Sequence, residues 1–341
     1  MQFNINIVPD EGCARVPLSA AGNIMVGIQS LYSRIGGYIV AKELRIQGDV
    51  PPALDERFKL YLDSSGGITI SSSSKVPGVT GHGSVTDDAL SMMGSLLEAA
   101  GSGAGGYWID DNYSTPHHRT AIAGDLMRIS ETLRSGGCTL VFGEEDRPVR
   151  FSGSDTDRLR RYIKDCSRTV PGATSGILER TDTRSKKTMY HLGNGSGRVR
   201  VVFSGNRAER AADGLLGNVP AVVSGMLAYS GDGRLAEIKD AEEPSRLETM
   251  KFRRMIGPNG DVRLSVPAVA EISYVRDGWR FSSGALGISV TKKDWDSAVT
   301  AFHDYFMFLW ETYAAAAGEG LGDEEKEVRS ELLRLVSAED V

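Results

Sequence analysis

The spacing of apolar residues changes at about residue 170 of this 341-residue chain, and this change most limits the fold. Before that point apolar residues recur at helical spacings of three and four, as in Ile24, Ile28 and Leu31. After Pro171, short runs that alternate between apolar and polar residues are separated by turns that contain glycine. Because a single element cannot follow both periods, we expect a multi-domain α+β protein.

The region before residue 170 predicts helices that alternate with strands. The expected helices are residues 20–45, 87–100, 115–134 and 154–166. The expected strands are residues 1–9 and two hairpins at 58–70 and 138–151. Gly36-Gly37 favours a kink in the first helix, and residues 71–83 predict a loop or linker. We divide this half into an N-terminal α+β region, 1–80, and a mainly helical region with a hairpin, 81–170.

Residues 171–243 contain three short strands, a helix and two further strands. The strands are expected at 176–179, 188–192, 199–203, 221–227 and 235–238, and the helix at 208–216. This order of elements resembles that of OB-like barrels. The resemblance implies a small barrel that holds single-stranded nucleic acid by stacking on the bases and by contacts with the phosphates.

The segment 147–210 is basic, although the whole chain has a net charge of −6. It contains 15 lysines and arginines against 6 aspartates and glutamates, a net of +9, so the rest of the chain carries −15. This charge predicts a nucleic-acid surface on the barrel. Its candidate residues are Arg184, Lys186, Lys187, Tyr190, Arg198 and Arg200. A solvated basic face or a seam against acidic regions would give the same pattern, and Tyr190 would then be a core residue.

The region 244–315 predicts strands followed by a helix over 295–313 that is capped by Asp294. Three runs, 279–281 (Trp-Arg-Phe), 286–290 (Leu-Gly-Ile-Ser-Val) and 295–299 (Trp-Asp-Ser-Ala-Val), resemble HicB-type antitoxin domains. The resemblance implies a HicB-like domain with a partial ribonuclease-H-like fold, which that family uses to bind a toxin. After it, the tail 316–341 predicts an acidic amphipathic helix.

Six consecutive apolar residues, Tyr305 to Trp310, lie on the last helix of that region. A helix with one buried face needs only about half of them, so we expect this turn to be covered on all sides. The cover is either another part of the chain or a partner protein. The candidate partner-binding residues are Tyr305, Phe306, Phe308 and Trp310, because aromatic residues often dominate protein interfaces.

Asp110, Asp111 and His118 have the residue types of a divalent metal site. Either aspartate can instead cap a turn, and His117 and His118 point about 100° apart on a helix. The glycines from Gly101 to Gly106 match a dinucleotide-loop pattern but follow a helix rather than a strand. The sequence has no G-x-S-x-G nucleophile motif. We therefore expect no cofactor and rank binding above catalysis.

No run of 18 apolar residues is present, and the first residues lack the pattern of a signal peptide. The three cysteines fit neither a disulfide framework nor a zinc site, so we expect a cytoplasmic protein outside the membrane. Our leading hypothesis is a non-catalytic binding or regulatory protein with a protein partner, such as an adaptor or an antitoxin-like regulator. The alternatives are a nucleic-acid-binding protein that uses 147–210 and, third, a metal-dependent hydrolase or nuclease.

Overall fold

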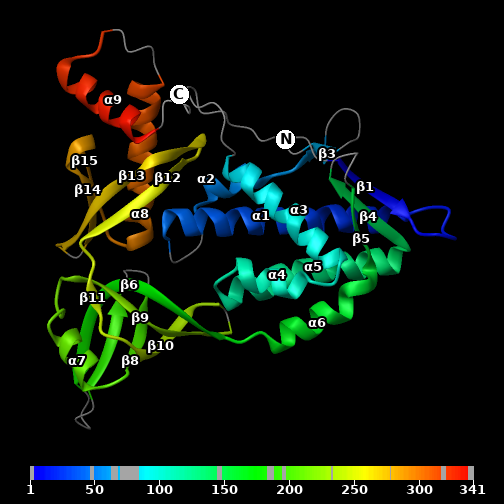
Figure 1. Cartoon of the computed structure of the whole chain (residues 1–341), viewed down its shortest axis with the longest axis horizontal. Helices are drawn as coiled ribbons and strands as arrows, with labels where there is room; N and C mark the ends of the chain where they lie inside the picture. The colour runs from blue at the N-terminus through cyan, green and yellow to red at the C-terminus, as the bar shows by residue number, and fades with distance from the viewer. Residues whose placement is uncertain are drawn as a thin grey trace. The chain divides into compact units, whose positions relative to one another are not determined.

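The computed structural model describes residues 4–46, 50–62, 68–69, 84–143, 148–182, 188–193, 197–231, 233–276, 278–315 and 320–336. Helices and strands are mixed along the chain, which confirms the predicted α+β class (Figure 1). The chain forms two compact units. The described residues of unit 1 fall within 1–40, 51–73 and 83–167, and those of unit 2 within 41–50 and 168–341.

Unit 1 combines a small antiparallel sheet with several helices. The sheet has the order β1 (Asn4–Pro9), β4 (Cys138–Gly143), β5 (Val149–Phe151). The helices are α1 (Leu18–Leu44), α2 (Pro52–Asp55), α3 (Val85–Gly101), α4 (Gly105–Asn112), α5 (Pro116–Gly136) and α6 (Thr156–Asp165). Strand β2 (Tyr61–Leu62) pairs with β3 (Ile68–Thr69), and the turn of this expected hairpin, 63–67, lies outside the described residues, as do 70–83.

Helix α1 supplies much of the core of unit 1, because its apolar residues recur on one face. Ile24, Ile28 and Leu31 are fully buried. The helix continues without a break through Gly36, where a Cβ atom would lie 2.1 Å from Cδ1 of Phe58. Glycine is therefore required here for the close approach of an aromatic ring. Phe58 itself ends a short 3-10 turn, Glu56–Phe58, and does not lie in the expected strand.

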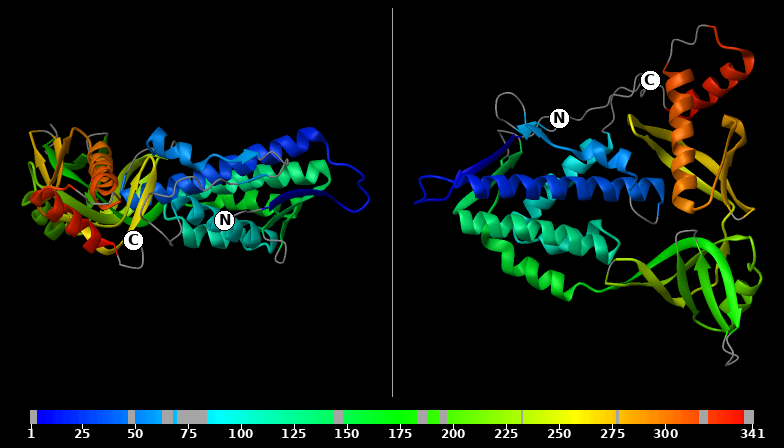
Figure 2. Two further views of the ribbon diagram at one scale, coloured as in Figure 1. Left: turned by 90° about the horizontal axis from the view of Figure 1, so that it is seen from above. Right: turned by 180° about the vertical axis from the view of Figure 1, so that it is seen from behind.

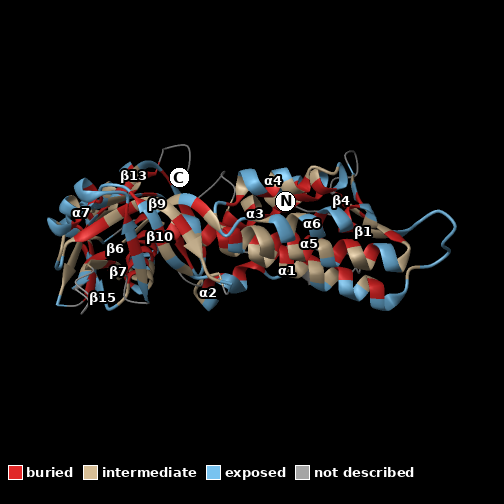
Figure 3. Cartoon of the chain, turned by 90° about the horizontal axis from the view of Figure 1, so that it is seen from below, coloured by how far each residue is buried: buried red, intermediate tan, exposed pale blue. Residues whose placement is uncertain are grey.

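The glycine-rich segment after α3 differs from the expected loop. Helix α4 begins at Gly105, two residues after Gly103, whose φ of +82° favours glycine. Helix α5 begins as expected, with Pro116 in its first turn and the Thr115 hydroxyl accepting a hydrogen bond from the His118 amide. Figure 3 shows buried residues alternating with exposed ones along the helices of unit 1.

Unit 2 begins with a closed five-stranded barrel. Its strands are β6 (Thr169–Asp182), β7 (Thr188–Gly193), β8 (Arg198–Phe203), β9 (Pro220–Tyr229) and β10 (Leu235–Ala241). They follow the order β10-β8-β7-β6-β9, and pairing of β9 with β10 closes the cylinder (Figure 2). Only β8 and β10 are parallel, and helix α7 (Asn206–Asp213) connects β8 to β9. The predicted order of three strands, a helix and two strands is thus confirmed.

A four-stranded antiparallel sheet completes unit 2. Its order is β12 (Thr249–Gly257), β13 (Gly260–Val275), β14 (Gly278–Ser283), β15 (Ile288–Lys292), and a short strand, β11 (Ser245–Arg246), pairs with β9 of the barrel. Helix α8 (Trp295–Leu309) packs on this sheet, continues into a π-helical turn, Trp310–Ala314, and is followed by α9 (Asp323–Leu335). Asp294 caps α8 as predicted, by accepting a hydrogen bond from the Ser297 amide.

The core of this second part of unit 2 is rich in aromatic residues. The rings of Trp279 and Phe281 meet Trp295 edge-on, with centroids 4.9 and 5.2 Å apart.

Within the described part of the chain, none of the helices combines the length and the apolar character that a membrane span requires.

Candidate binding sites

Two arginines of the barrel point outward because the side chains of a strand alternate between its two faces. On β8, Val201 and Phe203 are buried in the barrel, whereas Arg198 and Arg200 are exposed. The register of the strands places His191 of β7 beside Arg200, and Glu179 of β6 beside His191. The sequence candidates Arg198 and Arg200 therefore lie on one outer surface, which crosses three neighbouring strands.

Both arginines on that surface form ion pairs with carboxylates. Arg198 Nη2 lies 2.9 Å from Glu179 Oε2, and Arg200 Nη1 lies 3.2 Å from Glu237 Oε1. Exposed ion pairs of this kind contribute only about 0–1 kcal/mol each, so an incoming anion can displace either carboxylate. The carboxylates nevertheless reduce the positive potential of the surface. Around Arg198 and Arg200 the described outer surface of the barrel therefore carries charges of both signs.

Tyr190 lies inside the barrel. Its ring packs edge-on against Phe203 at 5.1 Å, and its hydroxyl donates a hydrogen bond of 2.9 Å to Asp213 Oδ1 of α7. Burial and then this hydrogen bond raise the pKa of Tyr190 to about 12. Its ring is covered by the barrel itself and does not form part of the outer surface.

The remaining basic candidates, Arg184, Lys186 and Lys187, lie outside the described residues. The segment 147–210 is divided between α6 of unit 1 and the barrel of unit 2. On α6, Arg158 pairs with Asp155, and Arg160 pairs with Glu131 and Asp157. The charge of +9 therefore does not belong to a single surface of one unit.

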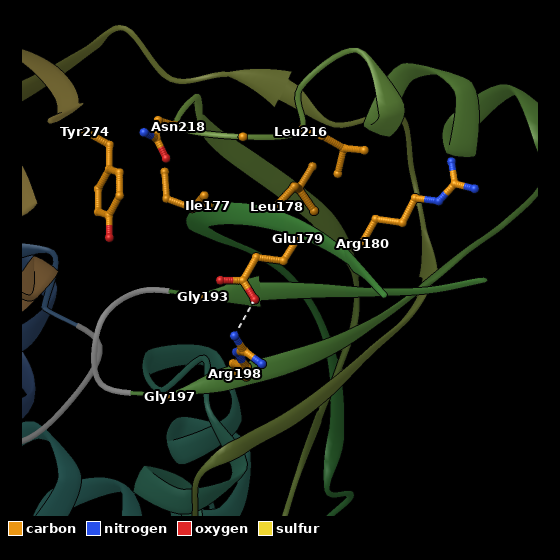
Figure 4. Close-up of a pocket in the computed structure, with 11 residues that line it drawn as sticks. Ile177, Leu178, Glu179, Arg180, Gly193, Gly197, Arg198, Leu216, Asn218 and Tyr274 are labelled. Atoms are coloured by element: carbon orange, nitrogen blue, oxygen red, sulfur yellow. Dashed lines mark ion pairs between the residues drawn. The ribbon is translucent and has the colours of Figure 1, made fainter. Parts of the chain in front are cut away.

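A pocket opens in unit 2 where the barrel adjoins Tyr274 of β13 (Figure 4). Its volume is about 660 Å³. Ile177 and Leu216 give it apolar walls, and Figure 4 shows Tyr274 and Asn218 together at one end and Arg180 at the other. The ion pair between Glu179 and Arg198 borders the same pocket. Arg198 is the one described lining residue that was a sequence candidate, because the others come from distant parts of the chain and share no local pattern.

Helix α8 presents two of its aromatic residues to solvent. Phe306 and Trp310 are fully buried in the core, whereas Tyr305 is 43% and Phe308 56% exposed. The exposed rings lie one turn apart, with centroids 6.1 Å from each other. In the part of the chain that the structure describes, this turn is therefore not covered on all sides. We call Tyr305 and Phe308 the aromatic pair.

The candidate metal ligands have other partners. Asp110 accepts a hydrogen bond of 2.7 Å from the Tyr162 hydroxyl and lies 3.1 Å from Arg119 Nη1. His118 contacts the Thr115 hydroxyl through Nδ1, and burial, aided by the neighbouring His117, lowers its pKa to about 4. Asp111 is exposed. Within the described ranges, no three His, Cys, Asp or Glu side chains are grouped so that they could hold a metal ion.

Comparison of the chain with models of known protein families, with curated proteins and with solved structures found no match.

Proposed function

We propose that this chain is a non-catalytic binding protein that recognises a protein partner through the aromatic pair, Tyr305 and Phe308. The observation that carries the proposal is the exposure of two large rings on a helix whose other aromatic residues are buried. Aromatic side chains that become fully covered at the centre of an interface are frequent hot spots of binding.

Burial of the aromatic pair at an interface would contribute a substantial part of a binding free energy. An aromatic side chain buries about 150–250 Å² in all. At about 25 cal/mol per Å², covering the exposed half of each ring is worth roughly 2–3 kcal/mol per ring. Asp304 and Glu311 flank the pair on the exposed face of the helix. An apolar groove with a basic rim is therefore the partner surface that we expect.

The resemblance of residues 279–313 to HicB-type antitoxin domains agrees with this proposal, because that family binds a protein. The inference from this chain rests on the aromatic pair and not on the family.

The test is co-purification of the tagged full chain with its partner from the organism that produces it. We expect one protein to be retained by the wild type and lost with the double variant Tyr305→Ser/Phe308→Ser. The matched control is Tyr107→Ser, because Tyr107 on α4 is an exposed tyrosine, 79% accessible, far along the sequence from the pair. A partner that all three proteins retain equally would refute the proposed surface.

A second candidate function is binding of single-stranded nucleic acid to the barrel. Arg198 and Arg200 both point outward on β8, and the order of the elements is that of an OB-like barrel. The carboxylates beside both arginines make this candidate weaker. Titration with labelled DNA and RNA at about 50 and 200 mM salt tests it, since phosphate contacts weaken steeply with salt. Absence of binding at the lower salt would remove this candidate.

A further inference from the structure

The pocket between the barrel and Tyr274 is separate from the aromatic pair and has the dimensions of a ligand site. Its volume of about 660 Å³ lies within the roughly 300–1,000 Å³ typical of small-molecule pockets. Its walls come from β6, from Gly193 at the end of β7, from Gly197 just before β8, from the connection between α7 and β9, and from β13. The cavity therefore exists only in the folded unit 2.

The groups of the pocket are ordered by chemistry along its length. Tyr274 and Asn218 lie together at one end, Ile177 and Leu216 occupy the middle, and Arg180 lies at the other end (Figure 4). A tyrosine ring provides a stacking surface for a flat aromatic group. The asparagine side chain provides one carbonyl acceptor and two N–H donors for the edge of such a group.

One guanidinium group of the pocket is held by only a weak ion pair. Arg198 pairs with Glu179 on one face of β6, whereas the side chain of Arg180, the next residue along that strand, lies on the other face. Arg180 Nη1 lies 3.2 Å from Asp213 Oδ1 of α7. The Arg198 side chain is 68% exposed, so its ion pair with Glu179 is a weak surface pair. A phosphate, which accepts two parallel N–H bonds from one guanidinium, competes well against such a pair.

We propose that this pocket binds a mononucleotide. The base stacks on Tyr274 and hydrogen-bonds to Asn218, and the phosphate is held by Arg198. The site is independent of the protein partner proposed above, because Tyr305 and Phe308 do not line it. Failure of either proposal therefore leaves the other standing.

The experiment is calorimetric titration of the full chain with each of four nucleoside monophosphates, with the nucleoside alone and with inorganic phosphate. We expect saturable binding of at least one monophosphate with a Kd below about 1 mM, and weaker binding of either half. Arg198→Gln and Tyr274→Leu should each weaken binding about tenfold, as expected for a lost phosphate contact and a lost stacking contact.

Two control variants separate this site from general effects. Tyr274→Phe keeps the ring and should bind within about twofold of the wild type. Arg207→Gln removes an exposed arginine outside the pocket, one that is also paired with a carboxylate, Glu243, and should likewise leave binding unchanged. Thermal unfolding of each variant checks that unit 2 is folded.

Three results would overturn the proposal. One is the absence of saturable binding by all four monophosphates, and another is binding that neither Arg198→Gln nor Tyr274→Leu weakens. The third is phosphate alone binding as tightly as the nucleotide, which would mean an anion site without a base. Competition by a 5′-phosphorylated oligonucleotide shows whether the nucleotide is free or the end of a strand, and the site stands in both cases.

Discussion

Of two phenylalanines on α8, Phe306 and Phe308, replacement of the first by alanine should destabilise the protein strongly, and replacement of the second should hardly change its stability. Phe306 is fully buried beside Phe302 and Trp310, whereas Phe308 is 56% exposed. Replacing a fully buried phenylalanine by alanine costs about 3–5 kcal/mol, because apolar contacts are lost and a cavity remains. Replacing a largely exposed residue usually changes the stability by about 0.5 kcal/mol or less.

Urea denaturation followed by tryptophan fluorescence measures this difference. Of the four tryptophans, Trp279, Trp295 and Trp310 are buried in unit 2, so the signal reports mainly on that unit. With a denaturant slope of about 2 kcal/mol per M, Phe306→Ala should lower the urea midpoint by roughly 1.5–2.5 M. Phe308→Ala should leave the midpoint within about 0.3 M of the wild type.

The two variants serve as controls for each other, because they carry the same substitution on the same helix. If Phe308→Ala destabilised unit 2 as strongly as Phe306→Ala, the ring of Phe308 would be covered by the chain. The aromatic pair would then not be available to a partner, and the proposed function would lose its supporting observation.

Two further predictions concern packing and acid stability. Gly36→Ala should destabilise unit 1 by about 1–3 kcal/mol in a denaturant titration, because its Cβ would overlap the ring of Phe58 and force a shift; an unchanged midpoint would contradict that packing. His303 is fully buried, accepts a hydrogen bond from the Ile256 amide through Nδ1, and has a pKa lowered by burial to about 3. Between pH 6.5 and 3 the unfolded chain therefore binds a proton at His303 that the folded chain does not. The free energy of unfolding thus falls as the pH falls, and at pH 5 the contribution of His303 to this loss is about 2 kcal/mol. His303→Asn, which keeps an acceptor for the amide, should remove that part of the pH dependence. If the free energy of unfolding changed as much between pH 7 and pH 5 in this variant as in the wild type, His303 would be protonated in the folded protein.

The sequence predicted the order of the barrel elements because the period-2 alternation of β7, β8 and β9 is local information. It placed only residues 176–179 of β6, which in fact extends from Thr169 to Asp182. Pro171 and Gly172 look like residues of a turn, yet they pair with Met226 and Gly225 of β9. Leu227 lies so close to Gly172 that a Cβ atom there would be 2.7 Å from Cδ1 of Leu227. This requirement arises from tertiary packing and leaves no local pattern.

The candidate sites were predictable only in part. Local sequence identified the aromatic run on α8, but the side of the helix that packs on the sheet decided which rings stay exposed. The basic charge of 147–210 identified Arg198 and Arg200 among six candidates, while their carboxylate partners Glu179 and Glu237 come from other strands. Sequence alone could not predict the pocket, since Tyr274 lies on β13, far along the chain from the barrel residues it adjoins.

The most direct test of the central claim is photo-crosslinking in cells from a benzoylphenylalanine placed at position 308, with the same group at position 107 as the control. Phe308 and Tyr107 are both exposed aromatic residues, on α8 and α4 respectively. The account predicts one discrete protein adduct from position 308 that Tyr305→Ser weakens and that position 107 does not form. No adduct at position 308, or the same adducts from both positions, would contradict a protein-binding function for the aromatic pair.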